Sequence, residues 1–236
     1  MRCIDKLGPL KLAHPLPFTI DGDLRARFPG LDARPCRMEG VRVASTVPSL
    51  EGRKEEIVEE VKGKYDLASL KDGRTFRAYR DFFWGIGLDP TKNRPAAEAL
   101  IRRILSGKSL PTVNSLVDAY NLASIETEIA LAAFDADKLH GGLVMRAARR
   151  GEEFWGVGMD GPIMLTGHEI VLNDDESLVA IYPHRDAKHS SITLGTANVL
   201  LLACGVPSLE DAELKEALNV ATRYVILFCG GTARAR

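Results

Sequence analysis

The sequence lacks the features that mark membrane and secreted proteins. Its longest apolar stretches, such as Tyr224 to Cys229, are far shorter than the roughly 20 residues that a membrane-spanning helix needs. The amino terminus has no basic segment followed by an apolar run, which is the pattern of a secretory signal. The four cysteines, Cys3, Cys36, Cys204 and Cys229, show no CxxC or zinc-ligand spacing. We therefore expect a cytoplasmic protein with reduced thiols and no membrane anchor.

An excess of positive charge is also missing. The chain has 31 Lys and Arg residues against 32 Asp and Glu residues, a formal net charge of -1. A protein that coats nucleic acid regardless of sequence needs surplus positive charge to displace counterions from phosphates, so any contact with RNA must use a local patch. The densest candidate consists of Arg94, Arg102, Arg103 and Lys108. The alternative for this cluster is an ordinary solvated helix face.

The first half of the chain carries mainly helical patterns. An extended segment, Val41–Thr46, is followed by a charged surface helix around Lys54–Lys62. Apolar residues at helical spacing then predict helices at Phe76–Trp84, Ala96–Ser106 and Asn114–Glu128. The second of these has a proline in its first turn and a glycine just beyond its end, which is typical of helix boundaries.

The second half changes to the pattern of a sheet. From Leu143 to Cys204, short apolar runs alternate with turn residues and predict strands. A last helix is expected to begin at Ser208, with Asp211 completing the capping box, and to end at Gly230. Helices grouped on both sides of a block of strands favour an α+β fold of layered mixed β-sheets with packed helices, in one domain over residues 1–236.

A glycine-rich segment, Gly156–Gly161, matches the dinucleotide-binding pattern GxGxxG as letters only. That mechanism needs a helix that opens at the last glycine and holds the pyrophosphate. Here the strand-like run Pro162–Leu165 follows instead, and Asp160 with Gly161 forms a turn dipeptide. The segment therefore predicts a hairpin.

Three reactive side chains directly follow the predicted strand Leu178–Ile181. His184, Arg185 and Asp186 can together orient a water molecule, polarise an ester carbonyl and receive a proton. The alternative is a strand-end turn held by an ordinary Arg–Asp pair. His184, Asp186 and His189 are also suitable donors for zinc, but their spacing fits no established site. We predict no metal and no cofactor.

A second polar group lies on the predicted helix Asn114–Glu128. Asn114, Asp118 and Asn121 form a stripe beside its apolar face and are candidates to bind an adenosine or an amino group. The alternative is a helix cap at Asn114, with the other polar groups satisfied by neighbouring backbone.

These motifs together resemble the B3/B4 editing module in the β subunit of bacterial phenylalanyl-tRNA synthetase, and above all its free-standing relatives. The matching elements are the Asn-x-x-Val-Asp element at 114–118, Phe134-Asp135, the Asp-Gly hairpin at 160–161, Tyr-Pro-His-Arg-Asp at 182–186, Ile-Thr at 192–193 and Thr-x-Asn-Val-Leu at 196–200. The resemblance implies binding of the acceptor end of tRNA and hydrolysis of wrongly charged aminoacyl-tRNA. It also implies that Asn114 and Asp118 border the pocket and that Lys188 and Thr196 belong to the substrate site.

Two positions depart from the synthetase pattern. Ala132 stands where that module has a pocket histidine, and an ungapped alignment places Lys188 where it has a glutamate that recognises the hydroxyl of tyrosine. Tyrosine is therefore not the expected substrate, because an ammonium cannot accept the hydrogen bond that a carboxylate accepts. We expect a stand-alone editing factor. The alternatives are a non-catalytic RNA-binding module and a small-molecule hydrolase or amino-acid-binding protein.

Overall fold

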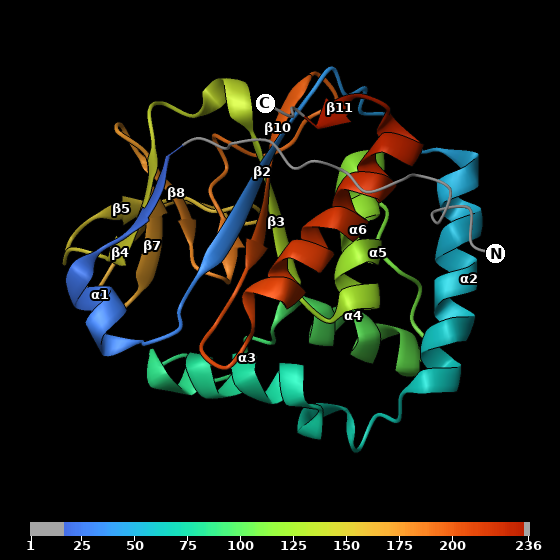
Figure 1. Ribbon diagram of the computed structural model, residues 1–236, viewed down its shortest axis with the longest axis horizontal. Coiled ribbons are helices and arrows are strands. Elements are labelled where there is room, and N and C mark those ends of the chain that lie inside the picture. Colours follow the sequence, from blue (N-terminus) through green and yellow to red (C-terminus); the bar gives the residue numbers. More distant parts are fainter. Residues whose placement is uncertain (1–16, 234–236) are drawn as a thin grey trace.

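The computed structural model describes residues 17–233 and contains an α+β fold with three layers, one of helices and two of sheet (Figure 1). The central layer is an antiparallel four-stranded sheet. Its strands lie in the order β11 (Thr232–Ala233), β2 (Ala33–Glu39), β10 (Asn198–Cys204) and β3 (Ala130–Asp135). Strands from the beginning, middle and end of the described chain therefore meet in one sheet.

The second sheet has five strands and is mixed. Strand β1 is parallel to β4, and the other neighbours are antiparallel. The strands lie in the order β1 (Phe18–Ile20), β4 (Leu143–Ala147), β7 (Ile170–Asn173), β8 (Leu178–Ile181) and β9 (Arg185–Asp186). A separate two-stranded hairpin is formed by β5 (Glu153–Phe154) and β6 (Ile163–Met164).

Most of the helices pack on the face of the central sheet that points away from the second sheet (Figure 1). They are α2 (Pro48–Lys64), α4 (Ala96–Leu105), α5 (Ser115–Thr127) and α6 (Asp211–Cys229). Helix α3 (Arg74–Gly85) crosses the lower edge of the layers in Figure 1, and α1 (Gly22–Arg27) is short. The 3-10 turns are η2 (Leu70–Asp72) and η3 (Ala136–Lys138).

Strand β10 separates two hydrophobic cores. Val199, Leu201 and Ala203 pack into the core beneath the helices, whereas the alternate residues Leu200, Leu202 and Cys204 pack into the core between the two sheets. Successive side chains of a strand point to opposite faces, so a strand covered on both sides must be apolar throughout. This explains the uninterrupted apolar run in this part of the sequence.

Much of the predicted pattern is confirmed. The helices predicted within residues 76–128 and the strands predicted after Leu143 are present, and β5 pairs with β6 across the predicted turn. Cys204 and Cys229 are buried free thiols, and Cys36 is buried as well, while Cys3 lies outside the described residues. Within residues 17–233, no helix is long and apolar enough to cross a membrane.

Three details of the prediction are wrong. Helix α6 begins at Asp211, and its capping box is formed by Glu210 and Glu213. Ser208 has a φ of 78°, a left-handed turn conformation that does not lead into a helix as a cap residue does. The expected extended segment at 41–46 contains no strand, because the strand lies earlier, at β2. Strand β3 was not predicted.

Candidate functional site

A cavity of about 160 Å³ lies between the two sheets, beside the carboxyl end of β8. His184, Arg185 and Asp186 line it together with Asn121 of α5. The predicted reactive group and one member of the predicted helix stripe therefore meet in one pocket. The apolar part of the wall comes from both sheets and includes Ala132, Phe134, Leu172, Ala180, Ile181 and Leu202.

A tight reversal of the chain places the three reactive side chains. Strand β8 ends at Ile181, the Tyr182–Pro183 peptide bond is cis, and the amide of His184 donates to the carbonyl of Ile181 over 2.8 Å. The chain then returns as β9, in which Arg185 pairs with Ile181. The buried Tyr182 donates its hydroxyl to the carbonyl of Gly205 over 2.5 Å, which anchors the turn to the loop after β10.

Asp186 has an unusual proton affinity. Burial raises the pKa of its carboxyl to about 7, although the neighbouring positive charge of Arg185 acts in the opposite direction. Among residues 17–233, no side chain donates a hydrogen bond to this carboxylate. Burial without compensating donors disfavours the charged form. Asp186 can therefore exchange a proton near neutral pH, as a general acid or base must.

The imidazole of His184 is affected in the opposite sense. Burial, reinforced by the charge of Arg185, lowers its pKa from the ordinary value. The ring is therefore mainly neutral at neutral pH and keeps one nitrogen able to accept a proton or a hydrogen bond. The pocket thus pairs a neutral imidazole with a carboxyl that titrates near 7.

Arg185 is held by the glycine-rich hairpin. One of its terminal nitrogens, Nη1, donates to the carbonyl of Val157 over 2.9 Å. A Cβ placed on Gly156 would lie 2.5 Å from Cδ of Arg185 and 2.9 Å from the sulfur of Met159, closer than real contacts allow. The glycine therefore lets the hairpin backbone lie directly against the arginine stem. The sequence indicated a hairpin at Gly156 but not this contact with Arg185.

Two groups in the pocket were not predicted. The phenol of Tyr120 and the thiol of Cys204 both line it. Burial raises the pKa of each group, and the charge of Asp186 contributes further to both shifts. In the sequence Tyr120 belongs to the apolar face of its helix and Cys204 to an apolar strand, and no spacing indicates that two elements so far apart converge.

Asn114 and Asp118 are not among the residues that line this pocket, although the family resemblance implies that they border the substrate pocket. Asn114 caps α5 by accepting hydrogen bonds from the amides of Leu116 and Val117. Asp118 is buried and forms an ion pair of 2.6 Å with Lys54 of α2. Asn114 is therefore a helix cap, which is the alternative given above. Asp118 instead joins two helices through an ion pair.

Lys188 and Thr196 also lie outside the pocket lining. The ammonium of Lys188 lies 3.9 Å from the centre of the Trp155 ring and borders another cavity. Thr196 is buried and donates its hydroxyl to the carboxylate of Asp135 over 2.8 Å. This hydrogen bond joins the loop before β10 to the end of β3, so the structure gives Thr196 a supporting position.

The basic cluster on and around α4 is partly neutralised. Arg102 pairs over 2.7 Å with Glu98, a fully buried carboxylate that also pairs with Arg80. The members exposed to solvent are Arg94, Arg103 and Lys108. A phosphate-binding role remains a prediction for these residues.

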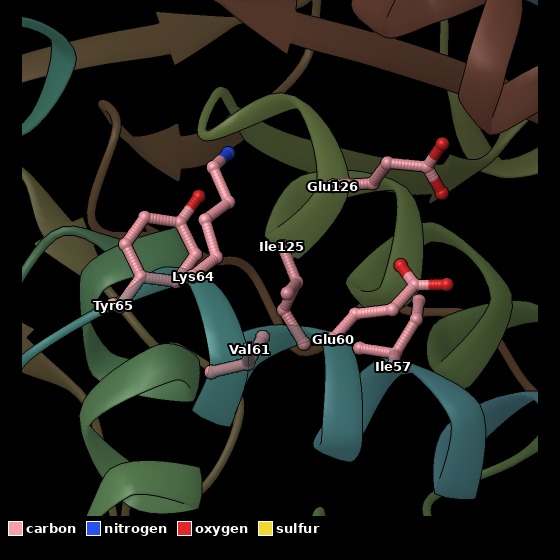
Figure 2. Close-up of a pocket in the computed structure, with 7 residues that line it drawn as sticks. All are labelled: Ile57, Glu60, Val61, Lys64, Tyr65, Ile125 and Glu126. Atoms are coloured by element: carbon pink, nitrogen blue, oxygen red, sulfur yellow. The ribbon is translucent and has the colours of Figure 1, made fainter.

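A second small cavity, of about 130 Å³, lies between α2 and α5 (Figure 2). Ile57, Val61 and Ile125 form its apolar floor, with Glu60 and Glu126 at one side. Both carboxylates pair with the buried Arg53, and Glu126 also accepts from the hydroxyl of Tyr224. Its acidic groups thus serve a network inside the helical layer.

Comparison with known proteins identifies the family of the chain. The profile of the B3/4 domain matches residues 78–230, and the chain belongs to this family. It is 27% identical over 158 residues to the phenylalanine–tRNA ligase β subunit of Chromobacterium violaceum, covering 57% of this chain and 20% of that protein. It is 28% identical over 196 residues to the corresponding subunit of Nitrobacter winogradskyi, covering 73% of this chain and 23% of that protein.

A solved structure confirms the fold. An N-terminal fragment of the phenylalanyl-tRNA synthetase β subunit from Pyrococcus horikoshii superposes with a TM-score of 0.53 at 15% sequence identity. The match covers 97% of this chain and 53% of that chain. This chain spans about a fifth of the length of the two bacterial subunits.

Proposed function

We propose that this protein binds the acceptor end of aminoacyl-tRNA and hydrolyses the ester of a mismatched amino acid. The convergence of His184, Arg185 and Asp186 in one pocket is the observation that carries the proposal, and the burial that raises the pKa of the Asp186 carboxyl to about 7 agrees with it. Membership of the B3/4 family and the relation to the β subunit of phenylalanine–tRNA ligase support the choice of an aminoacyl-tRNA as substrate.

Hydrolysis of the ester requires activation of a water molecule and stabilisation of the negative charge that forms on the carbonyl oxygen. In the proposed mechanism, ionised Asp186 takes a proton from a water molecule as the water oxygen attacks the ester carbonyl carbon. Arg185 has further N–H donors besides the one bound to Val157, and these stabilise the negative charge on the carbonyl oxygen. The ester C–O bond then breaks, and the ribose oxygen takes the proton from Asp186. His184 orients the water molecule.

The cavity accommodates an uncharged side chain. Its volume of about 160 Å³ is similar to the ~150 Å³ of an engineered cavity that holds benzene. The expectation that tyrosine is not the substrate keeps one support in this cavity, the apolar side chain of Ala132. Lys188 borders another cavity and therefore does not determine this specificity.

The decisive experiment is a deacylation screen over a panel of mischarged tRNAs, with Asp186→Asn and the matched control Asp160→Asn, an exposed hairpin carboxylate. Asp186→Asn should lower the rate by at least about 100-fold, the usual scale for a positioned acid–base group, and Asp160→Asn should leave it unchanged. A fully active His184→Ala/Asp186→Asn double variant would remove both residues from the mechanism. Rapid, selective hydrolysis of tyrosyl-tRNA would contradict the specificity.

The second candidate function is RNA binding without catalysis. It is favoured by Ala132, which lines the pocket at the position where the B3/B4 editing module of the synthetase has a histidine. Binding of tRNA without hydrolysis of any ester in the panel would support it over the first.

A further inference from the structure

A separate cavity of about 330 Å³ lies beside the reactive pocket and has a different chemical character. Trp155, Lys188, His189 and Ser177 contribute its aromatic and polar groups, and Phe154, Leu178 and Ala187 line its apolar floor. The volume falls within the ~300–1,000 Å³ of small-molecule sites. None of the chemistry proposed for Asp186 uses this cavity.

Trp155 is held in place while remaining accessible. Its indole N–H donates to the carbonyl of Met159 over 3.0 Å, and 42% of the residue is exposed. The ammonium of Lys188 lies 3.9 Å from the ring centre, a cation–π contact. Among residues 17–233, no carboxylate forms an ion pair with this ammonium. An exposed aromatic ring therefore adjoins a cation that is paired with no carboxylate in the described part of the chain.

Backbone pairing connects this cavity with the reactive pocket. The amide of Lys188 donates to the carbonyl of Trp155, Gly156 bridges Ala187, and the amide of Val157 donates to the carbonyl of Asp186. The two segments thus run antiparallel, with Trp155 opposite Lys188 and Val157 opposite Asp186. Two residues of a strand span about 7 Å, so the backbone of Trp155 and Lys188 lies about 7 Å along this ribbon from the backbone of Asp186.

We propose that Trp155 and Lys188 form a subsite for the unpaired nucleotides at the 3′ end of an RNA, with a base stacked on the indole and its phosphate near the ammonium. Aromatic stacking beside a cation is the usual chemistry for single-stranded nucleic acid. The exposed carboxylate of Glu153, which also lines the cavity, is suited to accept from the exocyclic amine of a base. The inference rests on the proposed function, because it places the 3′ end so that a terminal ester reaches Asp186.

The test uses RNA that carries no amino acid and therefore does not depend on catalysis. The chain has two tryptophans, Trp84 and Trp155, so the Trp84→Phe variant leaves Trp155 as the sole indole reporter. Its fluorescence is titrated with an RNA hairpin that carries a four-nucleotide 3′ overhang ending in CCA, with the same hairpin cut blunt, and with AMP alone. The overhang hairpin should quench the fluorescence, whereas the blunt hairpin and AMP should not do so at equal concentration.

Affinity variants complete the test, with binding followed on a dye-labelled overhang hairpin. Trp155→Ala should raise Kd by about 10-fold, as expected when one base stack is removed, whereas Trp155→Phe should raise it by less than about 3-fold. Trp84→Ala removes the more exposed tryptophan, which lies on α3, and should leave Kd unchanged. Circular dichroism confirms that each variant is folded.

Each outcome separates this inference from the proposed function. Quenching by the overhang without hydrolysis of any ester keeps the subsite and refutes the hydrolase. Hydrolysis with an unchanged Kd and kcat/KM in Trp155→Ala refutes the subsite and keeps the hydrolase. Equal quenching by the blunt hairpin or by AMP refutes recognition of a single-stranded end.

Discussion

The ammonium of Lys54 on α2 lies 2.6 Å from the carboxylate of Asp118 on α5, with 8% and 1% of the two side chains exposed. Lys54 also contacts Glu51 and Thr112, while Asp118 accepts from the amide of Val113. A charged pair is therefore enclosed within the helical layer, and it ties two helices and the loop before α5 together.

Breaking this pair should destabilise the protein. Asp118→Ala leaves a buried ammonium with Glu51 as its remaining carboxylate, and we expect a decrease of about 3 kcal/mol in the free energy of unfolding, the lower end for a broken buried pair. The apolar double variant Lys54→Met/Asp118→Leu should recover most of it. Urea unfolding measures both. Deacylation by the double variant at wild-type rate would show that Asp118 is structural, and a rate abolished despite restored stability would return it to the substrate site.

Activity and stability should depend on pH in opposite directions through Asp186. Its folded pKa of about 7 exceeds the roughly 4 of an unfolded aspartate, so between these values the folded state binds more protons. Stability should fall as pH rises from 4 to 7, by no more than about 4 kcal/mol. The rate should rise through pH 7, because the ionised form acts as the base.

Asp186→Asn provides the control for both effects. Its stability should not show this decline between pH 4 and 7, and its residual rate should lack the step near 7. Thermal unfolding and initial rates at a series of pH values measure the two curves. An identical pH dependence of stability in wild type and variant would show that the carboxyl is not buried as described.

Substitutions of two glycines in one hairpin should differ sharply. Gly156→Ala places a methyl group against the stem of Arg185 and should cost about 1–3 kcal/mol, as overpacking does, while lowering the deacylation rate. Gly161→Ala is the matched control, because a Cβ there meets nothing within 4 Å. Equal rates for the two variants would contradict a role for the clamped arginine.

The basic cluster should reveal itself in the salt dependence of tRNA binding. Arg102→Ala/Arg103→Ala should weaken binding and flatten the plot of log K against log salt by roughly one unit for each phosphate that is no longer bound. Arg103 should account for more of the change, because Arg102 is held by Glu98. Lys62→Ala, an exposed cation on α2, serves as control. An unchanged slope would identify the cluster as a solvated face.

Local signals predicted elements whose boundaries are fixed by nearby residues. Pro95 and Gly107 bracket α4, and Asp160 with Gly161 turns the β5–β6 hairpin. Strand β3 was not predicted because its Ala-rich sequence, ALAAFD, has a high intrinsic preference for helix. Pairing with β10 overrides that preference. The α6 cap was misplaced because residue type favours Ser208 as a cap, whereas the backbone at Ser208 is left-handed and the helix is capped by Glu210.

The candidate site was predictable as far as contiguous residues define it. His184, Arg185 and Asp186 are adjacent in sequence and share the pocket. The structural role of Asp118 depends on its ion pair with Lys54, which lies 64 residues away in the sequence. No pattern within α5 indicates this partner. Tyr120 and Cys204 were missed for the same reason, since their proximity to Asp186 exists only after both sheets are assembled.

The position of β10 also constrains how this chain folds as it is synthesised. Residues 198–204 lie between β2, at 33–39, and β3, at 130–135, so both partners must wait until most of the polypeptide has left the ribosome. Until then β2 and β3 keep unpaired edges and uncovered apolar faces, a state prone to aggregation. A nascent chain arrested before residue 198 should therefore be captured by chaperones or degraded. Slow translation should favour correct pairing of the central sheet only after residues 198–204 have left the ribosome.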